Sequence, residues 1–548
     1  MKKLLALALL LLPLAAAAGA QIHHGHSFRP SEKKFPLIPG MGELNHKVTT
    51  TNPTAQAYFN QGLTLVYGFN YDGAFASFRE ALAADPGLAM AQWGMALAKG
   101  ANINIDIDAE RMKEAAQHVA LARTLSARAT QQERNYIEAL STRYSPDPAT
   151  ADKMQLAADY SRAMAQLARK YPSDPDASTL YAESLMDLRP WRLWTRDGKP
   201  YEGTQAVVDV LKATIAAHPR HAGAVHYHLH ALEPSPLWAQ AAGDAALLQT
   251  LVPASGHLVH MPSHIFYLQG DYERASQSNL QAIKVDLDYK KNVADDGYVG
   301  HYLSHNMHFL AVARSMQGRF ADALAAARQA EANVLEHVAE EPGLEHYLTT
   351  PTLVLARFEQ WDGLLTAREP ERARLIAHAM WTWGRAAGFA GKRDVARARA
   401  AQREFKREAA AAGCYLSWGN NPTGALLNVA DLDLSARISA AAGDDYAAAQ
   451  ILKIAADAVK DLLYDEPPPW FIPPYEAMGR ALLRAGRPAE AERAFREDLK
   501  LNRRNGRSLY GLAESLRAQR RSREAAAAGR EFERAWKSAD TRLDTGAL

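Results

Sequence analysis

Histidines gather in one part of the chain, between His218 and His308. This stretch holds eleven of the nineteen histidines. Side chains three, four and seven residues apart lie on the same face of a helix. Three segments carry such triplets of groups that can bind a metal ion: His226, His230 and Glu233; His257, His260 and His264; and His301, His305 and His308.

The donor types indicate the chemistry, because neutral imidazole binds zinc, copper, iron and nickel, and Glu adds a hard oxygen ligand. The sequence therefore predicts a transition metal site for zinc, copper or iron. The expected ligands are His226, His230, Glu233, His260, His264 and His305. The residues expected to orient these ligands, or to form a second site, are His228, His257, His301, His308, Asn306 and Tyr302.

Two other interpretations of the histidines stay open. They would line a hydrogen-bonded groove for an anionic peptide or small molecule, or they would only stabilise a polar core. A lone buried histidine is usually structural, whereas three helical triplets are harder to explain in that way. No HExxH motif is present, so zincin-type hydrolysis lacks its sequence mark. Whether the expected metal site is catalytic is left open.

The elements that carry these residues are predicted to be helices. From about Asn52 onward, apolar residues recur three and four apart between short Gly, Asp and Pro turns, and strand-like alternation is scarce. The histidine-bearing helices are expected at about 222–233, 257–269 and 298–317, with partner helices at about 237–249 and 271–288. Pro262 is expected to start a helix, which weakens the shared face for His257.

The helices also repeat in pairs. In the segment 58–86, small, aromatic and turn residues fall at the positions of a 34-residue helix–turn–helix unit: Gly62, Ala74, Phe78, Ala81 and Pro86. Near the end of the chain, Tyr475, Gly479, Ala491, Phe495 and Leu499 repeat the scheme. The histidines keep the same period, because His226 and His230 are followed 34 residues later by His260 and His264.

This pattern resembles the tetratricopeptide repeat (TPR) family. The resemblance implies an all-α, TPR-like helix–turn–helix solenoid of roughly eight to eleven helix pairs, with a concave inner groove lined by the first helix of each pair. The histidine triplets would then stack side by side on the inner wall. TPR grooves commonly hold peptides of partner proteins, so a protein or peptide partner is also implied.

A narrower resemblance rests on the runs HLVHMPSHI, LQGDY, SHNMHFL, DEPPPW (465–470) and SLYGLAESL (508–516). These runs are similar to a group of exported bacterial TPR proteins with a His-rich core. The resemblance implies fold and export, and it implies no activity. On the residues alone, DEPPPW is expected to be a structural turn into the next repeat, and SWGNNP (417–422) a loop that could close over a groove.

The chain is divided into six parts on these patterns. They are a signal peptide at 1–20, an irregular segment at 21–51, N-terminal repeats at 52–215, His-rich central repeats at 216–360, degenerate repeats at 361–470 and C-terminal repeats at 471–548. The first part has two lysines, an apolar run and small residues before a cleavage site expected after Ala20. We therefore expect export, to the periplasm in a Gram-negative source.

Composition narrows the choice of partners. Without Lys2 and Lys3 the chain has 61 basic and 61 acidic residues, so nucleic acid is not expected as a partner. After the signal peptide, no apolar run reaches the roughly 18 residues that span a bilayer. The single cysteine, Cys414, excludes an intramolecular disulfide. The sequence does not specify an oligomeric state.

Two classes of function follow. The first is an exported TPR protein that binds a transition metal in its His-rich groove, as a metal-dependent enzyme or as a protein that stores or delivers metal. The second is a periplasmic scaffold that binds peptides in the groove without metal. Metal content distinguishes the two, since only the first requires it.

Overall fold

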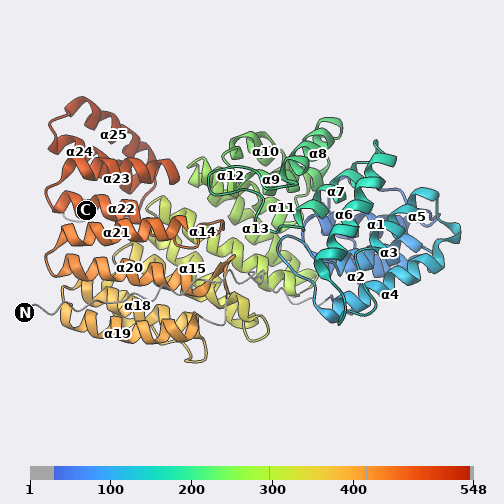
Figure 1. The fold of residues 1–548 in the computed structure, drawn as a ribbon, viewed down its shortest axis with the longest axis horizontal. Helices are drawn as coiled ribbons and strands as arrows, with labels where there is room; N and C mark the ends of the chain where they lie inside the picture. Colours follow the sequence, from blue (N-terminus) through green and yellow to red (C-terminus); the bar gives the residue numbers. More distant parts are fainter. Residues whose placement is uncertain (1–29, 295, 414–416, 544–548) are drawn as a thin grey trace, which may run out of the picture.

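The computed structural model describes residues 30–294, 296–413 and 417–543. The expected signal peptide, its cleavage site and residues 21–29 of the irregular segment lie outside the described residues, as does Cys414. Within them the chain is almost entirely helical, and each helix packs against the next one along the chain. Figure 1 shows the resulting array of antiparallel helices. The expectation of an all-α helix–turn–helix solenoid is confirmed.

The N-terminal part of the array begins with a capped helix. The Asn52 side chain accepts hydrogen bonds from the first turn, and Pro53 occupies the first helical position. Its elements are α1 (Pro53–Tyr67), α2 (Tyr71–Ala84), α3 (Ala89–Ala98), α4 (Ala109–Leu125), η1 (Ser126–Arg128), α5 (Gln131–Ser141), α6 (Lys153–Lys170), α7 (Pro175–Met186) and α8 (Thr204–Ala217).

Small residues set how closely these helices pack. A Cβ added to Gly62 of α1 would lie 2.7 Å from the Phe78 ring of α2, and one added to Gly94 of α3 would lie 2.5 Å from the same ring. The C-terminal repeats use the same device, since Gly479 and Gly511 both contact the Phe495 ring. The glycine and aromatic positions predicted from the repeat pattern therefore form the contacts between successive helices.

The central part carries the histidines. Its elements are α9 (Ala222–Leu232), η2 (Trp238–Ala241), α10 (Ala242–Leu251), α11 (Gly256–His260), α12 (Pro262–Leu268), α13 (Tyr272–Asn292), the π-helical turn η3 (Val299–Leu303), α14 (Ser304–Met316), α15 (Phe320–His337), η4 (Pro342–Thr349), α16 (Thr350–Arg357) and α17 (Trp361–Thr366). The three expected histidine-bearing helices are confirmed. Pro262 starts α12 as expected, while Met261 keeps helical dihedral angles between α11 and α12.

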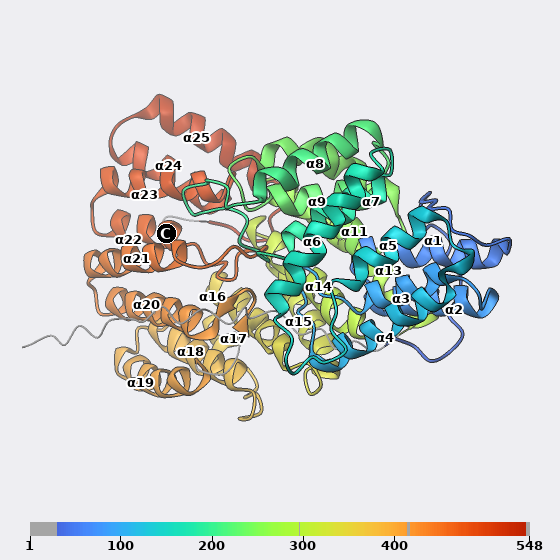
Figure 2. The same cartoon turned by 45° about the vertical axis from the view of Figure 1, so that its right-hand side comes forward.

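The C-terminal part forms one column in which α18 to α25 stack approximately in chain order (Figures 1 and 2). Its elements are α18 (Leu375–Gly391), α19 (Val395–Ala412), β1 (Ser417–Trp418), β2 (Asn421–Pro422), α20 (Thr423–Ala441), α21 (Asp445–Lys460), α22 (Pro474–Arg484), α23 (Pro488–Leu501), α24 (Gly506–Ala518) and α25 (Ser522–Ala535). The two short strands pair as an antiparallel hairpin. No helix in the described part of the chain has the length and apolar character needed to cross a bilayer.

The array curves far enough for its C-terminal end to contact the central repeats. The Tyr272 hydroxyl donates to the Arg503 carbonyl oxygen at 2.8 Å, and the Phe320 backbone N–H donates to Asp540 at 2.7 Å. One large apolar cluster runs through the N-terminal and central parts and on into α18, α19 and α20, and the last repeats have a smaller core of their own. This curvature brings loops of the C-terminal part over the histidine-bearing helices.

Candidate metal centre

The expected histidines fall into two groups of three, each built in the same way. Two histidines four residues apart come from one segment, and the third comes from the next one. In each group the ligand nitrogens lie within 4.8 Å of one another. We name them the 260 cluster (His260, His264 and His305) and the 226 cluster (His226, His230 and His257).

In the 260 cluster the Nε2 atoms converge. His260 Nε2 lies 2.8 Å from His264 Nε2 and 3.1 Å from His305 Nε2. Zinc–nitrogen bonds of about 2.0–2.1 Å in a tetrahedral site place ligand nitrogens about 3.3 Å apart. The three nitrogens are therefore close to the spacing that one bound ion requires.

The opposite ring nitrogens determine which tautomer is present. His260 Nδ1 donates to Asn279 Oδ1 at 2.7 Å, and the Asn279 amide nitrogen in turn donates to the Ala275 carbonyl oxygen. His264 Nδ1 donates to Glu233 Oε2 in a short hydrogen bond. Because these Nδ1 atoms carry hydrogen, the Nε2 atoms of His260 and His264 present lone pairs toward each other. Two lone pairs that face each other repel, whereas a cation bound between the two Nε2 atoms would be coordinated by both.

The 226 cluster shows the same division of roles. His226 Nδ1 donates to the Tyr67 carbonyl oxygen at 2.6 Å, while its Nε2 lies 3.1 Å from His257 Nε2. His230 Nδ1 donates to Glu233 Oε1 at 2.7 Å. His230 Nε2 is buried and has no hydrogen-bond partner among the residues that the structure describes.

Glu233 connects the two clusters. One carboxylate oxygen accepts from His230 and the other from His264. Burial alone would raise the pKa of Glu233, but the neighbouring His264 and His230 imidazoles lower it to about 2. Glu233 was expected as a possible ligand, and the structure places it behind the ligands, where an ionised carboxylate orients imidazoles.

Most of these histidines are neutral at pH 7. Burial, followed by repulsion from neighbouring imidazoles, lowers the pKa of His226, His257 and His305 well below the usual value. Burial and the nearby His264 have the same effect on the pKa of His260. Neutral imidazole is the form that binds metal, so no proton has to be removed before an ion enters.

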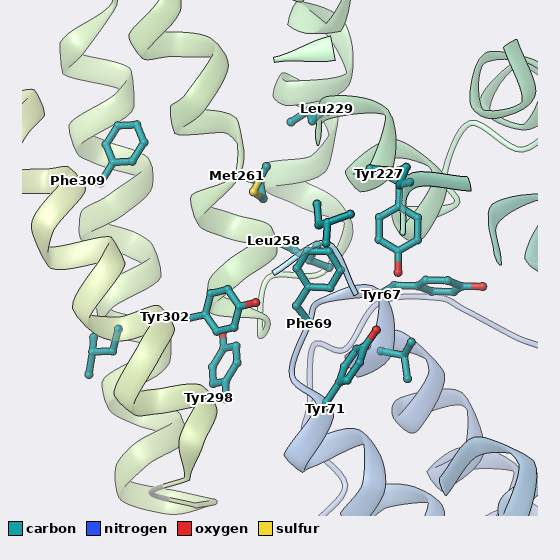
Figure 3. Close-up of a cluster of buried hydrophobic side chains, with 14 of the residues drawn as sticks. Tyr67, Phe69, Tyr71, Tyr227, Leu229, Leu258, Met261, Tyr298, Tyr302 and Phe309 are labelled. Atoms are coloured by element: carbon teal, nitrogen blue, oxygen red, sulfur yellow. The ribbon is translucent and has the colours of Figure 1, made fainter. Parts of the chain in front are cut away.

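Aromatic rings close the buried side of each cluster. The Phe69 ring lies 4.8 Å from that of His226 and 5.3 Å from that of His257, and the Phe309 ring lies 5.3 Å from those of His260 and His264. Figure 3 shows Phe69, which lies between α1 and α2, and Phe309, which lies on α14 with His305. This packing keeps water away from one side of each cluster and fixes the orientation of the rings.

The other side opens into one cavity of about 70 Å³, room for a few water molecules or a small ligand. His230 and His257 of one cluster line it, as do His264 and His305 of the other. The remaining wall is lined by Asn104, Trp191, His301, Tyr302, His308, His346, Tyr347, Trp418, Gly419, Asn420, Asp465, Glu466, Pro467 and Pro469. We call this the central cavity.

Two carboxyl groups of the 465–470 loop lie in the cavity wall. Burial raises the pKa of Asp465 to about 7, and its Oδ2 accepts the Asn420 backbone N–H at 3.0 Å. Burial also raises the pKa of Glu466, followed by repulsion from Glu233. The Oε1 atom of Glu466 is buried without a hydrogen-bond partner in the described part of the chain. These groups can hold or exchange a proton beside the clusters.

The other predicted residues divide between the cavity and its surroundings. His301, His308 and Tyr302 line the cavity, and burial lowers the pKa of His308 to about 3. His228 pairs instead with Asp244 at 2.6 Å and is not part of the cavity lining. Asn306 donates to Asp286 at 2.7 Å and also lies outside the lining.

Sequence reasoning missed the acids of the 465–470 loop, which it interpreted as a structural turn. Asp465 lies about two hundred residues beyond the histidines, so no spacing rule relates them. The available signal was an acidic pair followed by three prolines that stiffen the loop. The 417–422 loop does contribute Trp418 and Asn420 to the cavity wall.

Two methionines lie close to the histidines in the sequence. Met261 and Met307 lie beside the histidines in sequence, and their sulfur atoms would favour copper. Both are buried in the main apolar cluster, and neither lines the central cavity (Figure 3 shows Met261). Within the described part of the chain, the cavity lining includes imidazoles, carboxylates, two tyrosines and two asparagines, but no sulfur donor.

A family model supports the repeat architecture in one segment of the chain. The tetratricopeptide repeat family model matches residues 55–87, the segment of α1 and α2. No curated protein matches the chain. Solved structures with similar folds include the human IFIT1 dimer with m7Gppp-AAAA, at 13% identity over 89% of this chain and 91% of that chain, with a TM-score of 0.36. Yeast Tom70 has 12% identity over 88% and 90%, with a TM-score of 0.29.

The TPR domain of P58(IPK) has 11% identity over 86% of this chain and 99% of that chain, with a TM-score of 0.23.

Proposed function

We propose that the protein binds a transition metal ion at the 260 cluster, through the Nε2 atoms of His260, His264 and His305. The observation that carries the proposal is the convergence of these three atoms, with separations of 2.8 and 3.1 Å from His260 to the other two. Hydrogen bonds from His260 and His264 Nδ1 to oxygen acceptors support it, because they direct lone pairs to one point.

The donor set favours zinc, copper or iron, the metals for which imidazole is a suitable ligand. Three protein ligands leave a position for water or a small ligand, as in catalytic rather than closed structural sites. The central cavity lies on that open side. An ion there would polarise a bound group, and Asp465 and Glu466 would exchange protons with it. This arrangement suits a metal-dependent enzyme, and it also suits a protein that stores or delivers the metal.

We also propose that the protein is exported. The support is the sequence of residues 1–20, which has the charge and apolar pattern of a cleavable signal peptide. Protein from the native periplasmic fraction is expected to begin at Gln21. Retention of the full-length chain in the cytoplasm would contradict export without affecting the metal proposal.

The test of metal binding uses untagged protein from its native compartment and elemental mass spectrometry. Wild type is expected to contain a stoichiometric transition metal. The double variant His260→Gln/His264→Gln should lose one equivalent while keeping its far-UV helicity, and His305→Gln serves as a second variant that is less buried. His228→Gln is the matched control, because His228 lies on the same group of helices and faces away from the cavity.

Two results would overturn the proposal. One is absence of metal from wild type even after reconstitution with zinc, copper and iron. The other is a full metal content in a folded double variant. Slow release to chelators would indicate a catalytic ion, whereas rapid release and refilling would indicate storage or delivery.

A scaffold role is the second candidate. It is favoured by the tetratricopeptide repeat at 55–87, since helical repeat arrays present extended concave surfaces to partners. The predicted result is a partner that crosslinks to the protein in cells and remains associated when chelator is added. Crosslinking that gave only products of the protein with itself would contradict this role.

A further inference from the structure

We infer that the 226 cluster binds a second metal ion, so that the protein holds two ions facing one cavity. This inference rests on the proposed function of the 260 cluster and extends it. The ligands are the Nε2 atoms of His226, His230 and His257. One ring nitrogen from each of the three residues lies within 4.8 Å of the others, and the Nε2 atoms of His226 and His257 are 3.1 Å apart.

The repeat architecture supplies the first argument. His226 and His230 precede His260 and His264 by one 34-residue period, so the two pairs occupy equivalent positions in successive units. In both units the third histidine comes from the next histidine-bearing segment of the array. Two of the three ligands of the 260 cluster therefore have equivalents in the preceding unit, and a third histidine meets them there as well.

The hydrogen bonds of the 226 cluster supply the second argument. The Nδ1 atoms of His226 and His230 donate to oxygen acceptors, which leaves both Nε2 atoms with lone pairs. A direct hydrogen bond between His226 and His257 would satisfy those two nitrogens. That hydrogen bond would still leave His230 Nε2 buried without a partner among the described residues. A metal ion bound there would be coordinated by the lone pair of this atom.

Glu233 supplies the third argument, because it serves both clusters with separate oxygens. Oε1 orients His230 in one cluster, and Oε2 orients His264 in the other. A carboxylate that only stabilised a polar core would not have to hold His230 and His264 with the Nε2 atom of each ring directed into its cluster. The single buried negative charge also offsets part of the positive charge of two nearby ions.

The position of the cavity indicates what the two ions do together. His230 and His257 line it from one cluster, and His264 and His305 line it from the other. Open coordination positions of both ions therefore face the same small space. A ligand with two oxygen or nitrogen donors, such as a carboxylate or dioxygen, would contact both.

The experiment titrates metal-free, full-length protein with Zn²⁺ and counts bound ions by native mass spectrometry. Wild type is expected to bind two ions. The variants His226→Gln/His257→Gln and His260→Gln/His264→Gln should each bind one, and His228→Gln should bind two. If the first double variant fails to fold, His230→Gln alone tests the same cluster. Among the described residues, the His230 Nε2 atom has no hydrogen bond to lose, so the only side-chain hydrogen bond that changes is the one from Nδ1 to Glu233.

The outcomes separate this inference from the proposed function. One ion in wild type that persists in His226→Gln/His257→Gln and disappears in His260→Gln/His264→Gln overturns the second site and supports the first. One ion with the opposite pattern supports the 226 cluster and overturns the 260 cluster. No binding by wild type overturns both. Co²⁺ loading provides an independent readout, with visible absorption expected to halve in either double variant.

Discussion

Replacing Glu233 by Gln tests whether the carboxylate orients the ligands of both clusters. In the native protein each of its oxygens accepts one imidazole Nδ1 hydrogen, from His230 on one side and His264 on the other. A carboxamide has only one acceptor oxygen, and its NH₂ group would face the second imidazole as a donor. That imidazole would have to move its hydrogen to Nε2, which removes the lone pair needed for coordination.

The magnitude follows from this tautomer change. Loss of a hydrogen-bond partner behind a metal ligand typically weakens metal binding about 10- to 100-fold, which corresponds to about 1.4 to 2.7 kcal/mol. Only one cluster loses metal affinity, because the Gln oxygen still accepts the Nδ1 hydrogen of the imidazole in the other cluster. We expect the affinity of one of the two sites for its ion to fall by this factor and the affinity of the other to stay close to that of wild type.

Competition between the protein and a chromogenic Zn²⁺ chelator measures this change. Asp244→Asn is the matched control, since Asp244 accepts a hydrogen bond from His228 at 2.6 Å, outside the central cavity lining. Its Zn²⁺ affinity should equal that of wild type. If the Glu233→Gln protein is folded and competes as well as wild type at every site, the orienting role assigned to Glu233 is refuted.

Two further predictions concern the scaffold. Gly62→Ala should lower the free energy of unfolding by about 1–3 kcal/mol, because the new Cβ would lie 2.7 Å from the Phe78 ring. The control Gly243→Ala, whose new Cβ would have no atom within 4 Å, should be neutral or slightly stabilising. Equal urea denaturation curves for the two variants would contradict this packing. Burial, followed by the charge of Lys99, lowers the pKa of His118 to about 4. As the pH falls from about 6.5 to 4, the unfolded chain binds a proton at His118 that the folded chain does not bind. The free energy of unfolding of wild type should therefore fall by on the order of 1–3 kcal/mol relative to pH 7, and that of His118→Gln should not show this loss. Parallel pH profiles of the urea midpoints of wild type and variant would contradict this prediction.

Much of the fold could be predicted from local spacing. Gly62 and Phe78 recur at the positions of a helix–turn–helix unit, and close helix packing requires a small residue opposite a ring. The period of 34 residues also predicted that His226 and His230 would occupy the same helical positions as His260 and His264. These features depend on helical periodicity and on contacts between neighbours in the chain, which a sequence displays directly.

The grouping of the histidines could not be obtained in this way. The sequence placed His257 in a triplet with His260 and His264, whereas in space its Nε2 lies 3.1 Å from that of His226 on α9, the preceding histidine-bearing helix. Which imidazoles meet depends on the crossing of adjacent helices and on side-chain rotamers. A shared helical face specifies direction but not the partner across the interface.

The cavity wall depends on still longer-range geometry. Asp465 and Glu466 reach the histidines only because the C-terminal repeats curve back toward the central ones, as the contact between Tyr272 and Arg503 also shows. The curvature of a helical array is the sum of many small rotations between successive units, each set by packing. Residue spacing therefore specifies which side chains lie on the inner face of each unit, whereas the accumulated rotation determines which distant loop comes to cover them.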